Sequence, residues 1–236
     1  MKLIVFGGTG RTGSAVLKQG VDIQDLEITA FVRNPSKIPS NVRRRLMKVV
    51  TGSVLNQDDV TNALVGQDAV ISCLGTALIG GEHHLMSEGI KNIVNGMREN
   101  GVKRVALVGS AAFLPGAPGA FITKRLASDH GNVIEFLRKA KDVDWTIAMP
   151  PFITQAPEVG NYKTAINKLP GASRAKAQDI AYWMLTCVQD DEEMRENTHQ
   201  MVGISSHYDS GAIISAKGLF VLGVIVSCVT LYFYYN

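Results

Sequence analysis

Residues 5–13 of the chain read VFGGTGRTG, a run of small residues directly behind the apolar stretch 2–6, KLIVF. Gly7, Gly10 and Gly13 have the spacing GxxGxxG between a predicted strand and a predicted helix. In such a unit the first glycine allows a tight turn, the second lets a pyrophosphate approach the backbone, and the third lets the helix pack on the strand. The unpaired N–H groups at the helix start also attract phosphate. The stretch therefore predicts a dinucleotide site rather than a plain turn.

Apolar runs of strand length alternate with helical patterns along the rest of the chain. Strands are expected at 2–6, 27–32, 47–50, 68–74, 104–108 and 145–149. Helices are expected at 13–20, 58–64, 86–100, 128–141 and 178–188. We expect the last helix to close the regular part. The alternation predicts an α/β fold with a doubly wound parallel sheet of the Rossmann type, in a single domain at residues 1–205.

The composition excludes several classes of protein. Of the 236 residues, 46% are hydrophobic and 19% are charged, which is typical of a globular domain. A net charge of +3 without a long basic stripe argues against a nucleic-acid partner. Cys73, Cys187 and Cys228 are widely spaced, as free thiols in a reducing compartment are. His83 and His84 are adjacent, but no cluster of cysteines or carboxylates completes a metal site, so we expect no metal ion.

The last residues have a different pattern. Residues 218–235 read GLFVLGVIVSCVTLYFYY and carry no formal charge. A helix that crosses a bilayer needs roughly 17–25 apolar residues, and aromatic side chains gather at membrane interfaces. We expect a linker at 206–216 and a transmembrane tail anchor at 217–235. The domain would then lie on the cytosolic face of an intracellular membrane, either the endoplasmic reticulum or the outer mitochondrial membrane. The alternative is a buried helix or strand of the globular domain.

The residues after the second predicted strand indicate which cofactor binds. NAD-binding units carry an acidic residue there for the ribose 2′-hydroxyl, whereas this chain reads FVRNPSK with Arg33 at that point. A guanidinium matches phosphate oxygens, so Arg33 favours a 2′-phosphate and hence NADPH. The alternative is a solvated basic loop, which is our interpretation of the nearby run 43–45.

Eight motifs follow one another over residues 2–190: VFGGTGRTG, VRNPSKIP, VGQDAVISCLGT, MSEGIKNIV, SAAFLP, SDH, MPPFI and GASRA. In this order they resemble the atypical short-chain dehydrogenases, an NmrA-like group of NAD(P)-binding proteins. Within that group the chain is most similar to the biliverdin-IXβ reductase or NADPH flavin reductase family.

This resemblance implies a set of cofactor-binding residues. Residues 10–13 would hold the pyrophosphate, Arg33 and Ser36 the 2′-phosphate, and 53–54 the adenine, while the serine after strand five and the PPFI segment (150–153) would flank the nicotinamide. The full set is Gly7, Gly10, Arg11, Thr12, Gly13, Arg33, Ser36, Ser53, Val54, Leu74, Gly75, Thr76, Ser110, Pro150, Pro151, Phe152 and Ile153.

The chain departs from the family's pattern in three places. The family usually has Asp where Ser53 stands, which puts one adenine contact in doubt. A histidine near the family's substrate pocket is replaced by Phe152, and the loop 116–124 is unusually rich in Gly and Pro. Substrate preference is therefore less firmly implied than cofactor binding.

The sequence lacks the catalytic tyrosine–lysine pair of the superfamily, and this limits the reaction that we expect. Classical members of the superfamily use a Tyr-x-x-x-Lys pair for proton transfer, but Tyr162 precedes Lys163 directly. A flavin or an open-chain tetrapyrrole needs only orientation beside the nicotinamide, with water as the proton source. Ser110 and His130 are the candidate catalytic residues. The alternatives are that Ser110 caps a turn and that His130 caps a helix or lies on the surface.

We expect a monomeric, membrane-tethered, NADPH-dependent reductase of flavins or tetrapyrroles. Two other functions remain open on the same fold. One is a regulator that senses NADP(H) without turnover, and the other is a membrane-tethered assembly factor.

Overall fold

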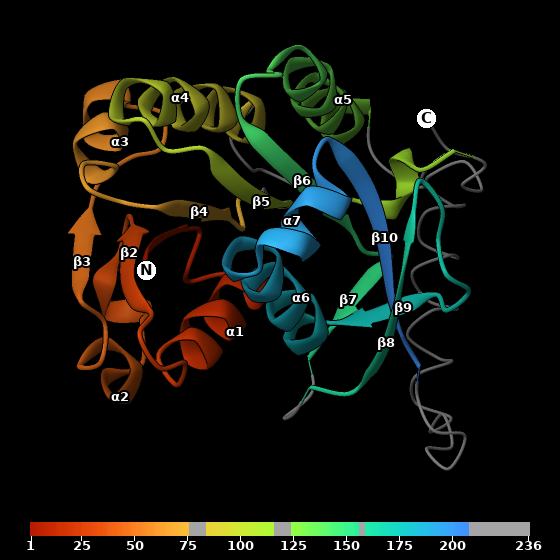
Figure 1. Ribbon diagram of the computed structural model, residues 1–236, viewed down its shortest axis with the longest axis horizontal. Coiled ribbons are helices and arrows are strands. Elements are labelled where there is room, and N and C mark those ends of the chain that lie inside the picture. Colours follow the sequence, from red (N-terminus) through yellow and green to blue (C-terminus); the bar gives the residue numbers. More distant parts are fainter. Residues whose placement is uncertain (76–83, 116–123, 156–158, 208–236) are drawn as a thin grey trace, which may run out of the picture. The chain divides into compact units, whose positions relative to one another are not determined.

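An eight-stranded sheet forms the centre of the fold, with helices on both of its faces (Figure 1). The structure is a computed structural model that describes residues 1–75, 84–115, 124–155 and 159–207, without the side chains of 124–127 and 207. Met1–Ser206 make up one unit. Thr76 and the predicted tail anchor lie outside the described residues. Among the helices within these ranges, none is long and apolar enough to cross a membrane.

The strand order is that of a dinucleotide-binding sheet. The strands are Lys2–Phe6 (β1), Glu27–Val32 (β2), Lys48–Thr51 (β3), Ala69–Ser72 (β4), Arg104–Val108 (β5), Asp144–Met149 (β6), Asn161–Ile166 (β8) and Gln200–His207 (β10). Their order is β3-β2-β1-β4-β5-β6-β10-β8, and the neighbours from β3 to β10 are parallel. The six predicted strands are confirmed as β1 to β6, in the order that a Rossmann fold has.

Helices cover the sheet in two layers (Figure 1). The helices are Arg11–Gly20 (α1), Ser40–Arg43 (α2), Gln57–Ala63 (α3), Leu85–Asn100 (α4), Lys124–Lys139 (α5), Ala177–Gln189 (α6) and Asp191–Asn197 (α7). α1 packs on α6 at one face, and α4 packs on α3 and α5 at the other. Leu3 and Val5 of β1 belong to the core beneath α1 and α6, and Ile4 and Phe6 belong to the core beneath α3, α4 and α5. Because alternate side chains of a strand point to opposite faces, an all-apolar strand serves both cores.

Smaller elements complete the carboxyl edge of the sheet. Two 3-10 turns lie at Pro35–Lys37 (η1) and Ala111–Phe113 (η2). A second, two-stranded sheet pairs Phe152–Thr154 (β7) in parallel with Arg174–Lys176 (β9). The sequence analysis did not predict any of these four elements.

The expectation that helix 178–188 closes the regular part is wrong, because α7 and β10 follow it. β10 pairs in parallel with β6 and ends at His207, inside the predicted linker. Its sequence QMVGISSH contains a glycine and two serines, and such residues weaken a strand pattern. Gly203 is needed there, since a Cβ would collide with the carbonyl oxygen of Lys168. A packing constraint from a distant loop therefore obscured the strand.

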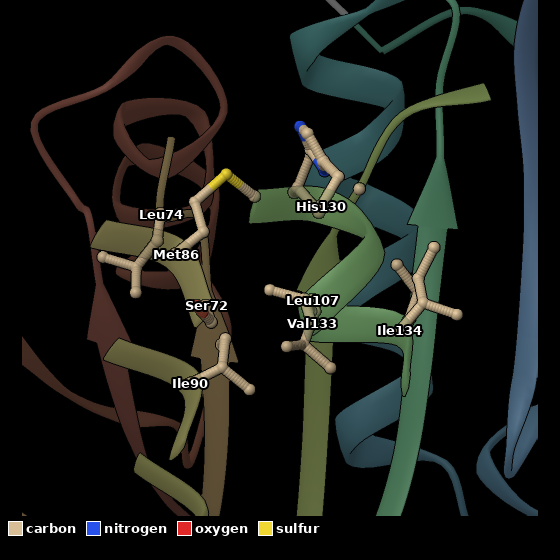
Figure 2. Close-up of a pocket in the computed structure, with 11 residues that line it drawn as sticks. Ser72, Leu74, Met86, Ile90, Leu107, His130, Val133 and Ile134 are labelled. Atoms are coloured by element: carbon tan, nitrogen blue, oxygen red, sulfur yellow. The ribbon is translucent and has the colours of Figure 1, made fainter. Parts of the chain in front are cut away.

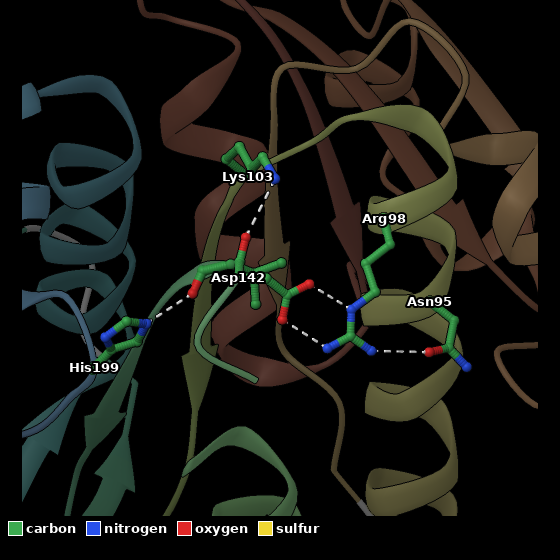
Figure 3. A network of polar contacts seen from close by, with 6 residues as sticks. Asn95, Arg98, Lys103, Asp142 and His199 are labelled. Carbon is green, nitrogen blue, oxygen red and sulfur yellow. Dashed lines mark hydrogen bonds and ion pairs between the residues drawn. The ribbon is translucent and has the colours of Figure 1, made fainter. Parts of the chain in front are cut away.

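A polar network fastens the edge of the sheet where β5 and β6 begin (Figure 3). Arg98 of α4 donates from Nε and Nη2 to both carboxylate oxygens of Asp142, at 2.7 and 2.8 Å. These bonds from the guanidinium lower the pKa of Asp142 to about 2. Lys103 donates to the backbone oxygen of Asp142, and Nε2 of His199 lies 2.9 Å from the carbonyl oxygen of Val143. The network joins α4, the turn before β6 and the residue before β10.

A carboxylate from another helix caps α4. Asp129 of α5 is buried, and its two oxygens accept the N–H groups of Met86 and Ser87 at 3.0 and 2.9 Å. Burial raises the pKa of the Asp129 carboxyl, but the hydrogen bonds from Ser87 and Met86 outweigh burial and hold that pKa below its ordinary value. The charge also faces the positive end of the α4 dipole. Asp129 therefore fixes α4 against α5.

Replacing Asp129 with Asn should lower the free energy of unfolding by about 1–3 kcal/mol, because the amide offers one acceptor for two buried N–H donors. The depressed pKa makes this contribution fully present above the unfolded-state pKa of about 3.9, and it is lost as the pH falls through the folded-state pKa. Urea unfolding at neutral pH and at about pH 3 measures both effects.

The matched control is Glu99→Gln, since Glu99 is an exposed carboxyl in the last turn of α4, the helix that Asp129 caps. Its effect on stability should stay below about 0.5 kcal/mol. A D129N protein as stable as the parent at neutral pH would show that the carboxylate does not cap α4.

Candidate functional site

The glycine loop lies where the strand order reverses. β1 pairs with β2 on one side and β4 on the other, and in α/β sheets ligands bind at the carboxyl end of this switch point. Gly7 has a φ of +75°, and a Cβ there would come within 2.5 Å of the carbonyl oxygen of Cys73. A Cβ on Gly13 would collide with the carbonyl group of Gly7. Only glycine fits either position, and the predicted strand, turn and helix are confirmed.

Gly10 is under a different constraint. A Cβ there would make only an ordinary contact, 3.4 Å from the carbonyl oxygen of Gly7. Gly10 is the N-cap of α1 and has no side chain that could accept a hydrogen bond. The first N–H groups of α1 therefore receive no side-chain acceptor from the N-cap. Thr12, in this first turn, is buried. Backbone donors at the start of a helix, with no Cβ in front of them, suit a pyrophosphate.

Arg33 and Ser36 follow β2 at the same edge. Phe31 of β2 pairs with Phe6 of β1, the last residue of that strand, so Arg33 lies level with the glycine loop that follows β1. The Arg33 side chain is exposed. Ser36 donates from its N–H and its hydroxyl to Oδ1 of Asn34, at 3.0 and 2.7 Å. Asn34 thereby caps η1 and orders the turn that carries both predicted residues. The sequence analysis gave Asn34 no role.

The predicted adenine contacts follow β3. Ser53 donates its N–H to Oδ2 of Asp59 at 2.9 Å, a contact that the sequence analysis missed. The side chains of Val54 and Leu74 contact α4 at Gly89. Val54 belongs to the buried core, and Leu74 packs against that core. The carbonyl oxygen of Val54 also faces α4, since it accepts from Nδ2 of Asn92 at 2.9 Å. Gly75 is exposed there.

Ser110 follows β5 and begins η2. Its Oγ accepts the N–H of Ala112 at 3.4 Å, so Ser110 does cap a turn. A hydroxyl that accepts one bond keeps its own proton for donation, so the cap is compatible with a further role. The N–H of Ala111 donates to the carbonyl oxygen of Pro150 at 2.9 Å. The Ser110 turn and the PPFI segment, both assigned to the nicotinamide by resemblance, are thus joined.

The other end of the PPFI segment is joined to the glycine loop. Nη1 of Arg11 donates to the carbonyl oxygen of Ile153 at 3.0 Å. Ile153 packs against the core under α1 and α6, whereas Phe152 is 78% exposed. The glycine loop, the Ser110 turn and the PPFI segment therefore form one connected surface, which we call the carboxyl rim.

An apolar pocket lies between α4, α5 and the carboxyl ends of β4 and β5 (Figure 2). Its lining is Ser72, Leu74, Met86, Ile90, Leu107, Val108, Gly109, His130, Val133, Ile134 and Ile147. Figure 2 shows the ring of His130 at the same end of the pocket as Met86. The ring of Phe113, in η2, lies 5.4 Å from the ring of His130. The pocket therefore adjoins the Ser110 turn.

His130 is the ionisable side chain among these lining residues. Burial lowers the pKa of His130, and the charge of Asp129 offsets part of this shift. The imidazole is therefore neutral at pH 7. His130 lies in the second turn of α5 and is half-buried, so it neither caps the helix nor lies free on the surface.

Metal binding has no support in the described parts of the chain. Within them, no group of three or more His, Cys, Asp or Glu side chains is arranged to hold an ion. His83 lies outside these ranges. That the chain binds no metal stays a prediction.

The geometry at Gly10 separates cofactor binding from folding. A Gly10→Ala change meets no close contact within the protein, but its methyl group would occupy the space in front of the α1 donors. We expect NADPH affinity to fall at least about tenfold, or 1.4 kcal/mol, with little change in thermal stability. Calorimetric titration with NADPH and a melting curve measure the two quantities.

Gly131→Ala is the control, because a Cβ at this helical glycine of α5 would also meet open space. It should leave NADPH affinity unchanged. Unchanged affinity in G10A would mean that the pyrophosphate does not pass over Gly10.

Comparisons with known proteins agree with this geometry. An NAD(P)H-binding family matches residues 7–191. A protein from Burkholderia pseudomallei, known from a crystal structure, is 26% identical in sequence to this chain. The two structures match with a TM-score of 0.70, over 87% of this chain and 99% of that chain. A short-chain dehydrogenase/reductase from Veillonella parvula in complex with NADP has a TM-score of 0.74 at 16% identity, over 90% of this chain and 99% of that chain. A Rossmann-fold NAD(P)-binding protein from Shigella flexneri has a TM-score of 0.71 at 20% identity, over 90% and 98%. The last two show likeness of fold.

Proposed function

Since the chain belongs to the NAD(P)H-binding family, we propose that it is an NADPH-dependent reductase whose acceptor is a flavin or an open-chain tetrapyrrole. The observation that carries this proposal is the carboxyl rim, which joins the glycine loop, the Ser110 turn and the PPFI segment and exposes the ring of Phe152. Aliphatic side chains from α4, α5 and the sheet line a pocket of about 10 Å³ next to the rim, which has room for one water molecule. The acceptor would therefore lie on the rim beside this apolar lining, which suits a flat conjugated molecule better than a sugar or a small polar substrate.

The position of Tyr162 supports an acceptor that needs no tyrosine acid. Tyr162 and Lys163 are neighbours in β8, so their side chains leave the strand on opposite faces. Burial, with a smaller effect from Tyr182, raises the pKa of Tyr162 to about 12. Tyr162 therefore keeps its proton near neutral pH, and its strand is separated from β5 by β6 and β10.

The residues of the carboxyl rim fit a dinucleotide. In the glycine loop neither Gly7 nor Gly13 has room for a Cβ, so α1 comes close to the end of β1 and its first N–H groups lie at the switch point. Arg33 follows β2 at the same edge, where a 2′-phosphate would bind. When bound, NADPH supplies the hydride. Ser110 would orient the reacting groups through its hydroxyl, the aliphatic lining would exclude water from the acceptor, and solvent would supply the proton. A neutral His130 would accept or donate one hydrogen bond at the pocket mouth.

Arg33→Gln should weaken NADPH binding about tenfold and leave NADH binding nearly unchanged, because the amide cannot form the charged, two-pronged bond to a phosphate. The dissociation constants of both cofactors, measured by calorimetry, test this. Arg43→Gln, an exposed cation of α2, is the control and should change neither constant. Equal losses for NADPH and NADH in R33Q would place the 2′-phosphate elsewhere.

Oxidation of NADPH with flavin, biliverdin and quinone acceptors tests the reaction itself. Because the pKa of His130 is lowered from 6.5, its protonation should alter kcat/KM only below about pH 6.5. His130→Gln should remove that acid limb and preserve the rate at neutral pH within about threefold. NADP binding without turnover of any acceptor would instead favour a cofactor-sensing regulator.

The membrane anchor is a separate proposal that rests on the uncharged run 218–235. We propose that residues 217–235 tether the domain to the cytosolic face of an intracellular membrane. A fluorescent protein fused to residues 206–236 would report this, and a diffuse cytosolic signal would reject it. Co-purification of the full chain with a membrane complex would favour an assembly factor.

A further inference from the structure

Two hydrogen bonds link strand β7 and the residues just before it to the rest of the carboxyl rim. It lies outside the eight-stranded sheet and pairs with the three-residue strand β9. The Pro150 carbonyl just before it is bonded to the Ser110 turn at 2.9 Å. Its own carbonyl at Ile153 accepts from Arg11 at 3.0 Å. One side chain thus links the glycine loop to a strand 142 residues later.

The direction of the Arg11 side chain decides its role. Resemblance assigns Arg11 to the pyrophosphate, but its Nη1 is turned across the rim to β7. The glycine loop already presents the N–H groups of the first turn of α1, which recognise phosphate without a side chain. A guanidinium bonded to a carbonyl keeps that carbonyl's strand in place through a charge-assisted bond.

The residue that this bond positions is Phe152. Ile153 packs inward against the α1 and α6 core, and the preceding side chain must therefore point outward, which explains why the Phe152 ring is exposed. A shift of β7 would move that ring relative to the glycine loop and the Ser110 turn. An aromatic ring at this place offers a face on which a flat conjugated acceptor stacks.

We propose that Arg11 is a positioning residue for acceptor binding: it fixes β7, and with it Phe152, relative to the glycine loop, and it contributes little to cofactor affinity. This inference rests on the proposed reductase function for its kinetic consequence. Its structural consequence, the local order of β7, does not depend on turnover.

The test uses Arg11→Met, which keeps the apolar stem and removes every donor, and Arg11→Lys, which keeps the charge and one donor group. Arg11→Met should raise the KM of a flavin acceptor about threefold to tenfold, the range expected for loss of one exposed hydrogen bond. The dissociation constant of NADPH should change less than about twofold, since the Arg11 guanidinium is bonded to the carbonyl oxygen of Ile153 and the backbone N–H groups of α1 would hold the pyrophosphate. Arg11→Lys should restore most of the acceptor KM. Lys18→Met, an exposed change in the same helix, should alter neither value.

Amide hydrogen exchange gives the second readout. In Arg11→Met the amides of 152–154 should exchange about threefold to tenfold faster, while those of β1 and β4 keep their rates and the melting temperature is unchanged. A parent protein without turnover would end the reductase proposal, yet faster exchange in β7 would still support the positioning role. A tenfold loss of NADPH affinity with unchanged acceptor KM and unchanged exchange would overturn it and make Arg11 a pyrophosphate ligand.

Discussion

The carbonyl group of Gly7 lies where a side chain at position 13 would stand, and the site depends on this close approach of α1 to the end of β1. The carbonyl oxygen of Cys73, after β4, crowds Gly7 in the same way. Two strands and one helix therefore meet with only backbone between them. The consequence is electrostatic: the N–H groups of the first turn of α1 lie at the switch point of the sheet, and Gly10 places no side chain in front of them.

The second half of the chain supplies the turns after β5 and β6 that lie beside the glycine loop. Three turns at the carboxyl ends of β1, β5 and β6 are bonded to one another through Ala111 with Pro150 and Arg11 with Ile153. Behind them, Asp129 holds α4 against α5 and so sets the width of the apolar pocket. The glycine loop thus offers backbone donors, whereas the apolar pocket and the PPFI segment offer side chains.

Sequence patterns predicted the first six strands. Five of them, β1, β2, β4, β5 and β6, are buried along most of their length and read as mostly apolar runs. The glycine spacing predicted the loop, because the constraint on each glycine is visible within one short stretch of sequence. The contacts of Arg11, Asp59 and Asp129 could not be predicted, since each joins segments whose proximity exists only in the folded chain. The resemblance implied that Phe152 flanks the nicotinamide, and only the exposed fraction of its side chain shows that the ring is turned outward.

The interior place of β10 has a practical consequence. This strand, the last of the described unit, lies between β6 and β8, so a chain cut near residue 190 would leave two neighbours with open hydrogen-bonding edges. Such edges recruit strands from other molecules and promote aggregation. A soluble fragment has to retain every residue through Ser206, although the family match ends at residue 191.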